Sequence, residues 1–119
     1  MKNKEKYKVR AQAVYNFLNA FPEKHDQDSF VEGVTTNLCG TTMCIAGTAV
    51  FLDGGVKALT ETLEGDRPDF DVQARELLGL TRDESRALFY TYDNENALKA
   101  LKALIKGNKE KFEKHTSRY

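Results

Sequence analysis

The segment from Met43 to Leu52 constrains the fold most, because it would carry no charged side chain on any face of a helix. A helix that is apolar all round is buried in the interior of a domain. Thr41 or Thr42 can cap its start by accepting a hydrogen bond from a free backbone N–H group. We therefore predict a buried central helix over about residues 42–52, ended by Asp53-Gly54-Gly55.

Apolar residues recur at helical spacing in several further segments, and most of these have their own start or stop signal. Pro22 ends the first segment, and Gly79 followed by Leu80 fits a left-handed helix end. Thr81 with Glu84 three residues later forms a capping box. Besides the central helix, the pattern predicts helices over residues 7–21, 56–63, 69–78 and 95–106, and one that opens after Thr81.

These helices predict an all-α fold, a compact single-domain bundle of five or six short helices around the central one. We expect one domain over residues 1–119, with residues 108–119 as a basic tail that frays. The composition agrees, because 40% hydrophobic and 30% charged residues are ordinary values for a globular chain.

The net charge of zero hides a strong segregation of charge along the chain. Residues 1–21 carry a net +4, residues 22–96 a net −9 and residues 97–119 a net +5. Either the basic ends pack against the acidic middle, or they present a basic face to an acidic partner. No stretch combines dense Lys and Arg with interleaved aromatic residues, so we do not expect a nucleic acid partner.

Two cysteines are too few for a disulfide-stapled secreted domain, and the longest uncharged window is densely apolar over only half the length that a bilayer requires. We therefore expect a cytoplasmic protein with reduced thiols that does not associate with membranes. Residues 72–89 resemble a helix-turn-helix in outline. Arg75 stands where that motif needs a small residue, so a plain helical hairpin is the better interpretation.

Cys39 and Cys44 flank the predicted start of the central helix and allow several interpretations. With His25 they could contribute to a zinc site, which needs four ligands, or they could form a disulfide. Cys39 could also be a nucleophile near a helix start, with His25 as its base. The remaining interpretation is structural, with both thiols packed as small apolar groups.

Gly40, Thr41 and Thr42 form a second candidate site. A glycine and two hydroxyl groups at a helix start leave backbone N–H groups free, and the helix dipole favours an anion there. The sequence lacks the lysine and the longer glycine spacing of a P-loop. These three residues therefore predict a site for a phosphate or carboxylate group, with helix capping as the simpler alternative.

Two phrases of the sequence together resemble a group of small uncharacterised proteins from bacteriophage and bacterial genomes. The first is Cys39-Gly40-Thr41-Thr42-Met43-Cys44-Ile45-Ala46-Gly47, and the second runs from Ala74 to Thr81 with Leu88-Phe89 after it. The group shares a C-G-T-x-x-C-x-A-G core, often followed by an aromatic residue where this chain has Thr48. The resemblance implies a phage or mobile-element setting and no particular reaction.

The sequence thus favours a non-enzymatic interaction protein over an enzyme, plausible as a phage-encoded modulator or inhibitor of a host protein in the host cytoplasm. The alternative is a protein that binds or sequesters a small anionic ligand, such as a nucleotide, at Gly40, Thr41 and Thr42. A weaker alternative is a cysteine- or metal-dependent enzyme that uses Cys39, Cys44 and His25. We expect no cofactor.

Overall fold

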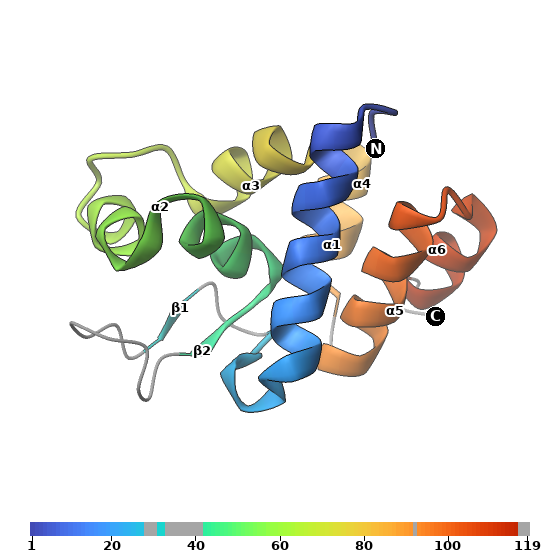
Figure 1. Cartoon of the computed structure of the whole chain (residues 1–119), viewed down its shortest axis with the longest axis horizontal. Coiled ribbons are helices and arrows are strands. Elements are labelled where there is room, and N and C mark those ends of the chain that lie inside the picture. The colour runs from blue at the N-terminus through green and yellow to red at the C-terminus, as the bar shows by residue number, and fades with distance from the viewer. Residues whose placement is uncertain (28–30, 33–41, 92, 117–119) are drawn as a thin grey trace.

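The computed structural model describes residues 1–27, 31–32, 42–91 and 93–116, and it confirms the all-α prediction (Figure 1). Two short elements accompany the helices, a 3-10 turn over Pro22–Lys24 and an antiparallel pair of two-residue strands, β1 (Val31–Glu32) and β2 (Thr42–Met43). The helices of the described residues are α1 (Glu5–Ala20), α2 (Ile45–Leu63), α3 (Phe70–Leu78), α4 (Arg82–Phe89), α5 (Asn94–Ile105) and α6 (Lys109–Thr116).

Helix α2 is the predicted central helix, and every residue from Met43 to Val50 is buried. Its start was predicted wrongly, because Thr42 lies in strand β2 and the helix begins only at Ile45 with Cys44 as its N-cap. Its predicted end at Asp53-Gly54-Gly55 is confirmed by the backbone. Gly55 has φ 70° and ψ −165°, so the helix breaks there and continues in a second segment to Leu63. The predicted short helix over residues 56–63 is that second segment.

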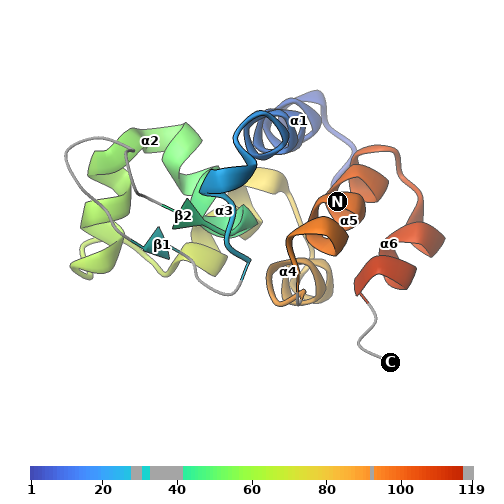
Figure 2. The same cartoon turned by 90° about the horizontal axis from the view of Figure 1, so that it is seen from below.

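Helix α1 packs between α5 on one side and α2 with α3 on the other (Figure 2). Its buried stripe is Tyr7, Ala11, Val14 and Leu18, as the helical spacing predicted. Phe21, which the same spacing placed in the stripe, is 47% exposed instead. The helix ends one residue before Phe21 because Pro22 follows, and the chain continues in the 3-10 turn Pro22–Lys24.

Helices α3 and α4 form the predicted hairpin, and local signals fix its turn. The backbone N–H of Leu80 donates to Arg75 O at 3.0 Å, and Gly79 adopts a left-handed conformation with φ 62°. Thr81 and Glu84 then form the capping box that opens α4. The hairpin therefore follows from residues within a few positions of the turn.

Helices α5 and α6 form a second hairpin. Asp93 caps α5 by accepting from Asn96 N, and Gly107 ends it with φ 70°. Asn108 then accepts from Lys111 N at 3.0 Å at the start of α6, whose Phe112 is buried. The segment predicted to fray is thus helical from residue 109 to 116, and the two basic ends of the chain lie together because α1 contacts α5.

None of the helices within the described residues has both the length and the apolar character needed to cross a membrane.

Substitution of Gly79 and Gly107 by alanine should separate backbone strain from close packing. Both residues have positive φ, but a Cβ on Gly79 would lie 2.6 Å from Tyr7 Cγ, whereas no described atom lies within 4 Å of one on Gly107. We expect Gly107→Ala to lower the free energy of unfolding by about 1–2 kcal/mol through strain alone. Gly79→Ala should cost a further ~1–3 kcal/mol because Tyr7 must also move. Urea unfolding of the two variants measures this difference, and equal losses would contradict the packing of Tyr7 on Gly79.

Candidate functional site

The structure describes only some of the predicted site residues. Cys39, Gly40 and Thr41 lie outside the described residues, so their proposed roles in ligand binding and thiol chemistry stay predictions. The backbone of Thr42 pairs with Glu32 in the small sheet. His25 and Cys44 are described, and both are buried.

Cys44 lies at the start of α2 with only 1% of its surface exposed. Burial raises the pKa of its thiol to about 11, although the backbone N–H groups of Ala46 and Gly47 act in the opposite direction. The thiol is therefore protonated at neutral pH. A nucleophile requires the thiolate, and Cys44 in this conformation is instead packed as a small residue of the hydrophobic core.

The His25 ring is buried, and its Nε2 lies 3.0 Å from Gln27 Oε1. Burial lowers the pKa of His25, against the opposing effects of Gln27 and Asp26. Its Nδ1 has no hydrogen-bond partner among the described residues. Within the same residues no three His, Cys, Asp or Glu side chains lie close enough together to hold a metal ion.

Gln27 connects the polar groups at the centre of the molecule. Its Nε2 donates to Leu88 O at 3.1 Å and to Phe89 O at 3.2 Å, at the end of α4. Its Oε1 accepts from Ile45 N at 3.3 Å, at the start of α2. Both N–H groups of the amide donate to carbonyls, so the atom that faces His25 is the amide oxygen Oε1. This oxygen can only accept a hydrogen bond, so the imidazole proton of His25 is assigned to Nε2.

Asn94 holds the same segment against α5. Its Oδ1 accepts from Gln27 N at 2.9 Å, and its Nδ2 donates to His25 O at 2.8 Å. The first backbone N–H of α2 is thus used by Gln27 and is not free for an anion. These contacts make the cluster of His25, Gln27 and Asn94 a structural joint between α2, α4 and α5. Sequence reasoning missed Gln27 and Asn94, since only the tertiary fold brings them together.

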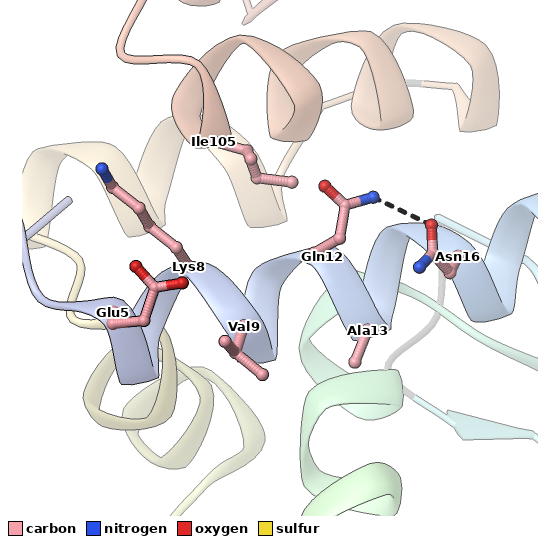
Figure 3. Close-up of a pocket in the computed structure, with 7 residues that line it drawn as sticks. All are labelled: Glu5, Lys8, Val9, Gln12, Ala13, Asn16 and Ile105. Atoms are coloured by element: carbon pink, nitrogen blue, oxygen red, sulfur yellow. Dashed lines mark hydrogen bonds between the residues drawn. The ribbon is translucent and has the colours of Figure 1, made fainter.

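The outer face of α1 is the second feature of interest, because it is apolar at its centre. Val9 is 57% exposed and Ala13 is also exposed. On one side they line a hollow of about 460 Å³, here called the α5-side groove, to which Ile105 of α5 contributes (Figure 3). The other residues that line this groove all belong to α1: Glu5, Lys8, Gln12 and Asn16.

On the other side of Val9 and Ala13 lies a second hollow of about 250 Å³, here called the α3-side groove. Leu52 of α2, which is 41% exposed, and the half-buried Leu77 of α3 form its far wall. The remaining lining residues are Arg10, Val14, Ala49, Asp53 and Leu78. Val9 and Ala13 therefore form a low apolar ridge between two parallel depressions.

Three phenylalanine rings extend this apolar surface toward the end of α1. The centroid of the Phe17 ring lies 5.2 Å from that of Phe21 and 5.8 Å from that of Phe51. Phe51 precedes Leu52 on α2. Phe21 is 47% exposed. Large exposed apolar areas on a soluble domain mark interaction surfaces more often than chance, whereas isolated exposed apolar residues need no explanation.

Basic residues lie along both sides of the ridge. Lys8 lines the α5-side groove, and the ammonium group of Lys102 on α5 lies 5.9 Å from the ring centre of Tyr15 on α1. On the other side, Arg10 Nη1 donates to Leu77 O at 3.1 Å, which holds its guanidinium at the edge of the α3-side groove. The surface thus joins an apolar centre to a charged border, in which Lys8, Arg10 and Lys102 outnumber Glu5 and Asp53.

A larger hollow of about 620 Å³ lies between α4, α5 and α6, but its character differs. Its apolar residues Leu104 and Phe112 are only 8% and 6% exposed, and its charged lining mixes Asp83, Glu113 and Lys109. This hollow presents no exposed large apolar side chain. The outer face of α1 is therefore the better candidate for a binding surface.

No protein-family model, curated protein or solved structure matches the chain. The described geometry and the sequence pattern are therefore the grounds for a function.

Replacement of Gln27 by methionine should destabilise the fold strongly. Methionine has a similar length but removes the acceptor of Ile45 N and the side-chain donor to Phe89 O, whereas Leu88 O keeps the backbone N–H groups of Tyr90 and Thr91. Unsatisfied buried groups cost about 1–3 kcal/mol each before relaxation. We expect the free energy of unfolding to fall by about 2–4 kcal/mol. Gln12→Met is the matched control, because Gln12 is exposed and bonds only Asn16 across one helical turn among the described contacts. If urea unfolding showed equal losses of unfolding free energy for the two variants, the stabilising role of Gln27 between α2 and α4 would be contradicted.

The stability of the protein should depend on pH through His25. Its pKa in the folded chain lies below the value of 6.5 for a free histidine, so the folded protein binds fewer protons than the unfolded chain below that pH. The free energy of unfolding should therefore fall as the pH drops through 6.5 toward the folded pKa, by at most about 1.4 kcal/mol per pH unit. The measurement is urea unfolding between about pH 7.5 and about pH 5.5 in a His115→Gln background.

Adding His25→Gln to that background removes the second of the two histidines and should flatten the pH dependence in this interval. Carboxylates with lowered pKa values, such as Asp93, titrate below it and do not interfere. A slope that persists without His25 would show that another group is its source.

Proposed function

We propose that this protein is a non-enzymatic interaction protein that binds a partner protein along the outer face of α1. The observation that carries the proposal is the apolar ridge of Val9 and Ala13 next to the α3-side groove, where Leu52 is also exposed. Exposing such side chains to water costs stability, because about 25 cal/mol is lost for each Å² of apolar surface left unburied. A partner that covers them recovers this free energy.

Cys44 and His25 support binding over catalysis only in part. Cys44 is packed in the core as a protonated thiol, and His25 is held by Gln27. Cys39, the other predicted nucleophile, lies outside the described residues, so the enzyme alternative stays a prediction. The resemblance of the sequence to phage and bacterial proteins is the ground for proposing a host protein as the partner. On this proposal the protein modulates or inhibits a host protein in the host cytoplasm.

The alternative, an anionic ligand at Gly40, Thr41 and Thr42, has less support. The helix start that motivated it lies at Ile45, and the backbone N–H there donates to Gln27 Oε1. Gly40 and Thr41 themselves lie outside the described residues, so this alternative stays a prediction of the sequence alone.

The proposal is tested by placing a charge in the α3-side groove. We expect Leu52→Glu to reduce capture of a stoichiometric partner at least about tenfold, which corresponds to about 1.4 kcal/mol of binding free energy. The assay is an affinity pull-down with the tagged protein from a lysate of cells in which it occurs naturally, quantified by mass spectrometry.

The matched control for Leu52→Glu is Leu63→Glu. Leu63 is 57% exposed, lies on the same helix and lines neither groove, so this variant should capture the partner normally. Thermal unfolding shows whether both variants stay folded. If Leu52→Glu is folded and captures as much partner as the unchanged protein, the α1 surface is not the binding site.

A further inference from the structure

We infer that the partner presents an acidic amphipathic α-helix, which lies along α1 with its apolar side in the α3-side groove and its carboxylates toward the basic border. This inference rests on the proposed function and names the chemical class of the partner. It is carried by the shape, the length and the charge of the surface.

The shape of the surface fits a helix. The α3-side groove runs between α1, α2 and α3, and grooves between packed helices accept the side-chain ridges of another helix. Ala13 lies beside this groove with only a methyl group, which allows a close approach of a second backbone. A helix is about 10–12 Å wide with its side chains, so a helix seated there also reaches across Val9 to the α5-side groove.

The length of the surface fits a short helix as well. The residues of α1 that line the α5-side groove run from Glu5 to Asn16, which spans about 17 Å at about 1.5 Å per residue. This distance equals roughly three helical turns. A peptide that binds by adding a strand to a sheet would instead need an exposed strand edge, and no part of α1 offers one.

The charge of the surface selects an acidic partner. Lys8 lines one groove, Lys102 stands over Tyr15 beside it, and Arg10 lies at the edge of the other groove. Each groove also has one acidic lining residue, Glu5 in the α5-side groove and Asp53 in the α3-side groove, so the positive excess comes from Lys102 and from the other lysines of the first 21 residues. The first 21 residues carry a net +4, so the potential over α1 attracts carboxylates and speeds their encounter.

The helix is identified by a photo-crosslinking amino acid, p-benzoylphenylalanine, placed at Gln12. Gln12 is exposed and lies on α1 between Lys8 and Asn16, so it should contact the partner without contributing to the apolar groove (Figure 3). Mass spectrometry of the crosslinked product gives the partner segment. We expect a segment with apolar residues every three or four positions and mostly Asp and Glu between them.

A synthetic peptide of that segment then tests the charge by fluorescence anisotropy. We expect the double variant Lys8→Glu, Lys102→Glu to weaken binding at least about tenfold, and binding to weaken between about 50 mM and about 300 mM NaCl. Lys57→Glu is the matched control, because Lys57 is an exposed lysine of α2 outside both grooves, and its binding should stay within about twofold.

The outcomes separate this inference from the proposed function. If Leu52→Glu removes partner capture but the lysine reversals and salt have no effect, the protein is an interaction protein and the acidic class is wrong. A crosslinked segment that is basic, or that belongs to a second copy of this chain, also overturns the inference. If Gln12 gives no crosslink and Leu52→Glu leaves capture intact, both the inference and the proposed function fall.

Discussion

The burial of the first half of α2 is the constraint on which the rest of the structure depends. Every residue from Met43 to Val50 is buried, so α1, α3, α4 and strand β2 must pack around this segment. The start of the helix is also buried, and its backbone N–H groups need partners there. Cys44 supplies no side-chain cap to α2, and Gln27 takes over part of that task from a distant segment of the chain.

The hydrogen-bonded cluster of His25, Gln27 and Asn94 therefore lies against the buried start of α2 and forms part of the interior. Gln27 links the start of α2 to the end of α4, and Asn94 fastens the same segment to α5. A buried network of this kind stabilises only when all its members are satisfied. Apart from His25 Nδ1, which has no hydrogen-bond partner among the described residues, the side-chain polar atoms of His25, Gln27 and Asn94 all bond within the fold.

The sequence predicted the elements whose signals are local and failed where the fold itself decides. The turn at Gly79 and the capping box at Thr81 need only neighbouring residues, and both were predicted. The start of α2 was misplaced because Thr42 is an equally good cap in isolation, and its pairing in strand β2 outweighs that preference. Gln27 was missed for the same reason, since nothing near it in the chain marks it as a partner of Ile45.

The exposed apolar residues follow from how the helices enclose α2. Helix α1 can cover α2 with only one stripe, and Val9 lies about 160–200° around the helix from Tyr7 and Ala11 at 100° per residue, so it faces solvent. Leu52 is exposed because α2 emerges from the core just before its break at Gly55. The core does not require an apolar side chain at Val9 or at Leu52, because both side chains are exposed. A polar residue at either position would remove the exposed apolar surface. Their presence on the two sides of one groove is the observation on which the proposed binding surface rests.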